Sequence, residues 1–158
     1  MRYADGPTVT VELYVDAPPA DVWPLVSDIN VPARFSSEFQ GATWIDDDHF
    51  RGRNRHEAAG EWETTCVVTE RSEPSVFAYA VGDAANPSAS WRFSLAPEGS
   101  GTRLTQWMRM GPAPSGLSPA IAAMPDKEER IIARRLDEHR FNMLMTLEGI
   151  KDLAESGK

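Results

Sequence analysis

Apolar and polar residues alternate strictly near the start of the chain, which predicts a β-strand over residues 8–15. The apolar positions of this strand are Val9, Val11, Leu13 and Val15. A short helix is expected to open at residues 17–21, because proline is tolerated in a first helical turn. Pro24 lies further in and predicts a kink or a later helix start. A second short helical segment is expected over residues 31–39.

The central part of the chain has the pattern of a series of short strands separated by turn residues. The expected strands cover residues 42–45, 50–56, 61–71, 76–81, 89–95 and 102–110. Asp, Gly, Pro and Ser gather between them, as in the tight turn Pro97-Glu98-Gly99-Ser100-Gly101. Successive hairpins indicate an antiparallel sheet rather than a parallel nucleotide-binding one.

The chain closes with helical periodicity over about residues 126–155. Asp126 and Glu129 have the spacing of a capping box at its start. Its apolar stripe consists of Ile132, Leu136, Met143, Leu147, Ile150 and Leu153. His139 falls on that stripe. The order of elements predicts an α+β fold in which a curved antiparallel sheet of six to seven strands wraps around the long C-terminal helix.

Composition limits the classes of function. The chain has 158 residues, 16 Lys and Arg against 24 Asp and Glu, and a formal net charge of −8. We expect one domain over residues 7–156, and the acidic charge disfavours nucleic acid and anionic lipid as partners. Residues 1–7 contain no apolar leader, and no run is long enough to span a membrane, so a cytoplasmic protein without membrane insertion is expected. The sequence leaves open whether it is a monomer or a homodimer.

The strand over residues 50–56 shows which sheet face is turned inward. Phe50, Gly52, Asn54 and His56 share one face, and Arg51, Arg53 and Arg55 share the other. Three arginines on one strand face are better placed in solvent than in a cavity, so the Phe50 face is assigned inward. The same alternation places further residues on that face: Trp62, Thr64, Cys66, Val68, Phe77, Tyr79, Val81, Trp91, Phe93, Leu95, Leu104, Gln106, Met108 and Met110. They form either a filled core or the wall of a cavity.

A few polar residues on this face and on the helix are candidates for orienting a ligand. They are Asn54, Thr64, Tyr79, Gln106, Arg135 and His139. His139 is either an acid/base or ligand-orienting group, or a buried imidazole that a backbone carbonyl or water satisfies. Arg135 either neutralises an acidic ligand or extends along the helix edge to solvent.

Other motifs give no sign of a metal or cofactor. His49 and His56 lie seven residues apart on one strand and point to opposite faces. The single Cys66 can form no internal disulfide and is expected to be a small core residue. No cofactor is expected. The Pro- and Gly-rich segment 111–125 carries Leu117 among other apolar residues, and we interpret it as a lid with a short helix near 118–123.

Several phrases in order resemble the START-like (SRPBCC) superfamily, in particular its bacterial polyketide cyclase/dehydrase-like branch. They are Val15-Asp16-Ala17-Pro18, Asp21-Val22-Trp23, Phe50-Arg51-Gly52-Arg53-Asn54, Trp62-Glu63-Thr64-Thr65-Cys66, Trp91-Arg92-Phe93, Gly101-Thr102-Arg103-Leu104-Thr105 and Leu147-Glu148-Gly149-Ile150-Lys151. The resemblance covers about residues 8–155. It implies a helix-grip fold, in which a hydrophobic ligand sits between the concave sheet and the last helix.

Three functions follow as hypotheses. The first is binding of a hydrophobic or aromatic small molecule, lipid- or polyketide-like, without catalysis. The second is a polyketide cyclase/aromatase, for which Tyr79 and His139 are the only proton-transfer candidates, and the third is a protein-binding module. The residues predicted to contact the ligand are Phe50, Asn54, Trp62, Thr64, Phe77, Tyr79, Trp91, Phe93, Gln106, Met108, Arg135, His139 and Met143.

Overall fold

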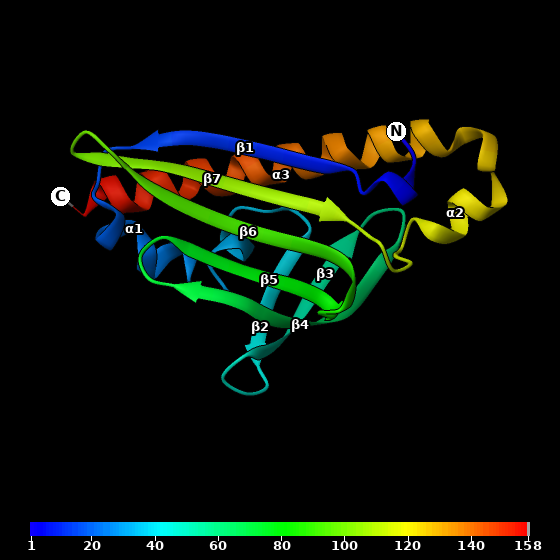
Figure 1. The fold of residues 1–158 in the computed structure, drawn as a ribbon, viewed down its shortest axis with the longest axis horizontal. Helices are drawn as coiled ribbons and strands as arrows, with labels where there is room; N and C mark the ends of the chain where they lie inside the picture. The colour runs from blue at the N-terminus through cyan, green and yellow to red at the C-terminus, as the bar shows by residue number, and fades with distance from the viewer. Residues whose placement is uncertain (158) are drawn as a thin grey trace.

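The computed structural model describes residues 1–157 and contains one curved sheet of seven antiparallel strands (Figure 1). The strands are β1 (Thr8–Val15), β2 (Phe39–Trp44), β3 (His49–His56), β4 (Gly60–Ser72), β5 (Val76–Asp83), β6 (Asn86–Glu98) and β7 (Gly101–Met110). Their order across the sheet is β1-β7-β6-β5-β4-β3-β2, so only the β1–β7 pair joins strands distant in sequence. All pairings are antiparallel, as the hairpin pattern predicts, and the sheet curls into a half-barrel (Figure 1).

Three α-helices accompany the sheet. They are α1 (Pro19–Val26), α2 (Ser118–Ala123) and α3 (Glu128–Ser156), with single 3₁₀ turns at Tyr3–Asp5, Pro32–Arg34 and Pro125–Lys127. The long α3 runs beside β1 and β7, with α1 near its C-terminal end and α2 beyond its N-terminal end (Figure 1). This is the helix-grip architecture that the sequence predicts. No helix within residues 1–157 is long and apolar enough to cross a membrane.

The two halves of α3 meet different surroundings. Leu147 and Ile150, in its C-terminal half, are fully buried in the core. Trp23 of α1 closes this end of the half-barrel, with its ring 6.4 Å from that of Phe77. Side chains therefore fill the space beneath the C-terminal half of the helix, whereas its N-terminal half lies over open space.

Strand register confirms the predicted inner face of the sheet. Tyr79 of β5 pairs with Trp91 of β6, which in turn pairs with Met108 of β7. Arg51, Arg53 and Arg55 are all exposed on the opposite face. Period-two alternation carries this assignment from one strand to the next because paired residues point to the same side of a sheet.

The prediction of a helical segment over residues 31–39 is wrong. Only Pro32–Arg34 makes a 3₁₀ turn, and Phe39 already belongs to β2. The Ser36 hydroxyl accepts hydrogen bonds from the backbone N–H groups of Glu38 and Phe39, each at 3.2 Å. Such local side-chain bonds favour a turn over a helix.

The first helix opens within residues 17–21 as expected, but the start of the last helix and the later start considered at Pro24 need correction. Asp126 and Glu129 do not form a capping box, because α3 begins at Glu128 after the 3₁₀ turn, and its N-cap Lys127 makes no side-chain cap. Pro24 does not delay the first helix, since α1 begins at Pro19 and contains Pro24 within it.

Candidate functional site

A cavity of about 900 Å³ lies between the concave face of the sheet and the N-terminal half of α3. The helix contributes Arg135, Glu138, His139, Asn142 and Met143. The β3–β4 hairpin at residues 58–59 and residues 115–117 with Ala120 complete the wall near α2. A volume in this range is typical of a site for one small organic molecule.

Every residue predicted to contact the ligand lines this cavity. They are Phe50, Asn54, Trp62, Thr64, Phe77, Tyr79, Trp91, Phe93, Gln106, Met108, Arg135, His139 and Met143. The inner face is thus a cavity wall at these positions rather than a completely filled core. Contact with a ligand stays a prediction for each of them.

The wall is mainly aromatic and its rings hold one another in place. The rings of Phe50 and Tyr79 meet edge-to-face with centroids 5.1 Å apart. Trp91 and His139 meet in the same way at 5.5 Å, which joins the sheet to α3. Such pairs stabilise a fixed wall shape beyond simple burial of their apolar area.

Several polar groups on this wall have no hydrogen-bond partner within residues 1–157. Gln106 is 5% exposed, and its Oε1 is a buried acceptor without a donor. The phenol of Tyr79, the amide of Asn54 and the imidazole of His139 also lack a partner in the described chain. Buried polar groups in native proteins are nearly always satisfied, which makes Gln106 Oε1 the exception among the described residues. The other three groups line the cavity, where water or a bound molecule can supply the hydrogen bonds.

Burial keeps three titratable groups of the wall, His139, Tyr79 and Cys66, uncharged at neutral pH. Burial, and secondarily the positive charge of Arg135, lowers the pKa of His139 to about 4. Burial also raises the pKa of the Tyr79 phenol far above its usual value, with Cys66 as a smaller cause. Burial raises the pKa of the Cys66 thiol to about 11, so the thiol stays protonated and is a poor nucleophile.

Charged side chains occur at the rim of the cavity, where they pair with one another. The guanidinium of Arg135 donates to both carboxylate oxygens of Glu38, at 2.7 and 2.6 Å, and to Glu138 at 3.0 Å. His56 Nε2 lies 3.1 Å from the second oxygen of Glu138. This rim cluster of Glu38, His56, Arg135 and Glu138 connects α3 to the β2–β3 edge of the sheet.

Of the two alternatives for Arg135, extension to solvent is wrong, because its side chain is only 16% exposed. Although burial works against the charge, hydrogen bonds and the charges of Glu38 and Glu138 raise the pKa of Arg135. Burial alone would raise the pKa of Glu138, but hydrogen bonds from His56 and Arg135 and the charge of Arg135 lower it.

Both acidic members of the rim cluster are missing from the site predicted from the sequence. Glu138 lies three residues after Arg135, a spacing that places two side chains on one helix face and is therefore a usable signal. Glu38 is 97 residues away from Arg135, and no local pattern connects them. His56 belongs to the predicted inner face but not to the predicted ligand contacts.

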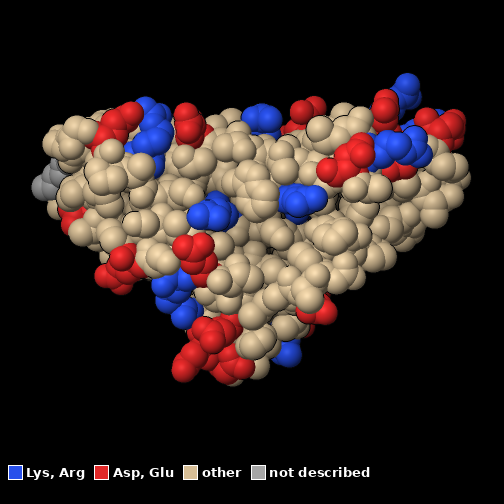
Figure 2. Space-filling view, viewed as in Figure 1, with Lys and Arg blue, Asp and Glu red and all other residues tan. Residues whose placement is uncertain are grey.

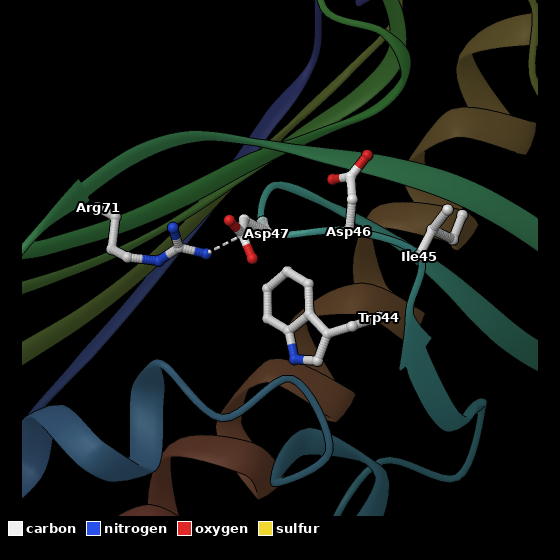
Figure 3. Close-up of a pocket in the computed structure, with 5 residues that line it drawn as sticks. All are labelled: Trp44, Ile45, Asp46, Asp47 and Arg71. Carbon is white, nitrogen blue, oxygen red and sulfur yellow. Dashed lines mark hydrogen bonds between the residues drawn. The ribbon is translucent and has the colours of Figure 1, made fainter.

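A second, smaller hollow of about 440 Å³ lies at the β2–β3 connection (Figure 3). Trp44, Ile45, Asp46, Asp47 and Arg71 line it. The guanidinium of Arg71 stacks over the Trp44 ring at 5.7 Å and donates to the backbone oxygen of Asp47 at 3.0 Å. These groups satisfy one another at an open surface, so the larger cavity is the better candidate site.

No group of three or more His, Cys, Asp or Glu side chains within residues 1–157 is arranged to hold a metal ion. His49 pairs with Asp46 at 2.9 Å in the β2–β3 turn, whereas His56 belongs to the rim cluster. The two histidines thus point to different parts of the molecule, in agreement with their spacing.

The sequence matches one known protein family over most of its length. Residues 7–138 match the family described as polyketide cyclase / dehydrase and lipid transport. None of the curated proteins matches the chain.

Solved structures share the fold. A polyketide-cyclase-like protein from Corynebacterium glutamicum is 26% identical, with 95% of this chain and 92% of that chain covered and a TM-score of 0.67. An aromatase/cyclase from Streptomyces sp. R1128 is 17% identical, with coverage of 95% and 94% and a TM-score of 0.66. The di-domain ARO/CYC protein BexL of the BE-7585A biosynthetic pathway is 16% identical, with coverage of 95% and 50% and a TM-score of 0.73.

Proposed function

The chain belongs to the polyketide cyclase / dehydrase and lipid transport family, and from this premise we propose that it binds a hydrophobic or aromatic small molecule. The binding site is the cavity between the sheet and α3. One observation carries the proposal: a space of about 900 Å³ has aromatic walls and a buried acceptor, Gln106 Oε1, without a donor. Removal of apolar ligand surface from water supplies affinity, at roughly 25 cal/mol per Å², and the polar groups supply orientation.

The direct test is native mass spectrometry of the protein purified gently from its own host. A retained small molecule is the expected result. Ala89→Phe should fill part of the cavity, because Ala89 lines it between Val81 and Met110. Ser90→Phe is the control, since the next residue of β6 points to the outer face.

The proposal requires the ligand to be reduced in Ala89→Phe and kept in Ser90→Phe. An unliganded wild-type protein, or equal retention by both variants, would contradict binding in this cavity.

A second candidate function is enolisation chemistry of the polyketide cyclase/aromatase type in the same cavity. The observation that favours it is the pair of unpartnered proton-transfer groups, Tyr79 and His139, on facing walls. With a pKa near 4, His139 is a neutral base at neutral pH and can accept a proton from a carbon between two carbonyls. The protonated Tyr79 phenol can donate a hydrogen bond to the resulting enolate oxygen.

Deuterium exchange at the central carbon of an aromatic β-diketone measures this step without presuming the natural substrate. If the protein is a catalyst, exchange is accelerated, and His139→Gln lowers the rate by about 10²-fold or more. Tyr79→Phe is measured in parallel, with ligand affinity determined for both variants. Acceleration that persists unchanged in both variants would remove these residues as the proton-transfer groups.

A further inference from the structure

We propose that the cavity selects an uncharged ligand bearing a hydroxyl group, which Gln106 binds, and that the rim cluster rejects anionic ligands. The inference rests on the proposed binding function and narrows its ligand class. Carboxylates and phosphates, and hence fatty acids and acidic phospholipids, are excluded. Neutral oxygenated aromatic molecules are favoured.

The described lining of the cavity offers an anionic ligand no free cation. Among the described residues that line the cavity, Arg135 is the sole Lys or Arg. Its guanidinium is held by Glu38 through two charge-assisted hydrogen bonds and by Glu138 through a third. An anionic group would have to displace one of these carboxylates to gain a counter-ion, and bidentate pairs of this kind are the strong ones.

The rim of the cavity also keeps an excess of negative charge. The backbone N–H of Ala58 donates to His56 Nδ1 at 3.0 Å, so this nitrogen carries no proton. His56 is therefore the neutral tautomer that donates from Nε2 to Glu138. Glu38 and Glu138 outweigh the single positive charge of Arg135, and the exposed Asp28 adds a further negative charge to the lining. The rim thus repels anions.

Inside the cavity wall, the side-chain amide of Gln106 is an unsatisfied polar group. Gln106 lies on β7 between Val11 of β1 and Phe93 of β6, with both neighbouring strands apolar at this point. Its side-chain amide hydrogen-bonds to no group within residues 1–157, and Oε1 is shielded from solvent. A hydroxyl can accept from Nε2, or donate to Oε1 once the amide turns this oxygen towards the cavity, so it matches a primary amide in either role. A carboxylate can only accept and adds an unpaired buried charge.

Three fluorescent probes of one shape separate these effects: butylpyrene, pyrenebutanol and pyrenebutanoate. Pyrene fluorescence gives the dissociation constant of each for the full-length protein at neutral pH. We expect pyrenebutanol to bind about tenfold tighter than butylpyrene. Its affinity should exceed that of pyrenebutanoate by a larger factor. Equal affinity for pyrenebutanol and pyrenebutanoate would overturn the inference.

Gln106→Leu tests the assigned partner. The variant is expected to lose the advantage of pyrenebutanol over butylpyrene, about tenfold. Retained binding of butylpyrene shows that the cavity of the variant is intact, so a folding defect is not mistaken for the effect. An unchanged preference for pyrenebutanol in Gln106→Leu would overturn the role of Gln106.

Glu38→Gln tests the rim by a gain of function. Release of one carboxylate from Arg135 is expected to tighten pyrenebutanoate binding about tenfold, with butylpyrene unaffected. Glu148→Gln, an equal charge change at an exposed position of α3, is the control and should have no effect. Equal gains in both variants would overturn the rim as the selective element. Failure of all three probes to bind wild-type protein would instead contradict the proposed binding function itself.

Discussion

At the scale of single residues, the position of His139 in the cavity wall determines the chemistry of its imidazole. His139 stands on the apolar stripe of α3 against the edge of Trp91, without a hydrogen-bond partner in the described chain. The sequence allows two interpretations, a functional imidazole or one satisfied by the protein. The absence of a partner within residues 1–157 disfavours satisfaction by a backbone carbonyl and leaves a neutral base facing the cavity.

The low pKa of His139 predicts a pH-dependent stability. The folded-state pKa is about 4 and the ordinary value is 6.5, so between these values the unfolded chain binds more protons. The free energy of unfolding should therefore fall as the pH drops from 6.5 towards 4. The contribution of this residue is at most about 3 kcal/mol.

Urea unfolding across this pH range, for wild type and His139→Gln, measures that contribution as a difference between two curves. The carboxylates with lowered pKa, such as Glu138, act in the same direction in both proteins and largely cancel. Parallel curves for the two proteins would contradict a depressed pKa at His139.

At the scale of elements, the packing of α3 depends on a residue without a side chain. Gly149 is buried, and a Cβ atom there would collide with the ring of Phe35. Phe35 lies in the segment that leads to Glu38 and β2, so this close approach brings the segment against the helix.

Gly149→Ala should therefore destabilise the protein by about 1–2 kcal/mol, because overpacking outweighs the gain in helix propensity. The same substitution in a Phe35→Ala background should be neutral or stabilising, since the ring that the new Cβ atom would meet is absent. Chemical unfolding of the four proteins forms a double-mutant cycle. An identical effect in both backgrounds would contradict the contact.

The segment around α2 is the element expected to move as a lid. The Tyr3 hydroxyl donates to the backbone oxygen of Ala113 at 2.6 Å and fixes the beginning of the segment. Leu117 packs against the core and lines the cavity, but α2 has only six residues and little stability of its own.

Hydrogen exchange tests the lid directly. Without ligand, amides of residues 115–121 should exchange faster than those of β6 and β7, and pyrenebutanol should slow them. Full protection of this segment in the absence of ligand would count against a mobile lid.

The architecture and the cavity wall could be predicted from the sequence for a physical reason. Side chains alternate between the two faces of a sheet, and the three arginines at alternate positions of β3 show which face is the outer one. Strand pairing then extends this assignment to the other strands. Irregular segments and long-range pairs give no such periodic signal. The turn at Pro32–Arg34 and the 3₁₀ start of α3 depend on local proline and serine geometry, and the Glu38–Arg135 pair depends on tertiary folding.

At the scale of the whole molecule, charge and aromatic residues are separated in space. Acidic residues gather at the tip of the β2–β3 connection, where Asp46, Asp47 and Asp48 are exposed (Figure 2). Much of the aromatic surface instead faces the interior, where it surrounds the cavity. A formal charge of −8 together with an acidic cavity rim is consistent with a neutral ligand rather than an acidic one.

The five tryptophans of the chain provide the most direct test that ligands bind in this cavity. Trp62 and Trp91 line it, Trp23 lies beside Phe77, Trp44 lies in the smaller hollow, and Trp107 alternates with Gln106 and Met108 towards the outer face. The measurement is the set of indole N–H resonances in a two-dimensional NMR titration with pyrenebutanol. Saturable shifts of the Trp62 and Trp91 signals are expected, with little change at Trp107 and at most a smaller shift at Trp44, whose ring contacts Phe50 of the wall. Shifts confined to Trp44 or Trp107, or no shifts at all, would contradict ligand binding in this cavity.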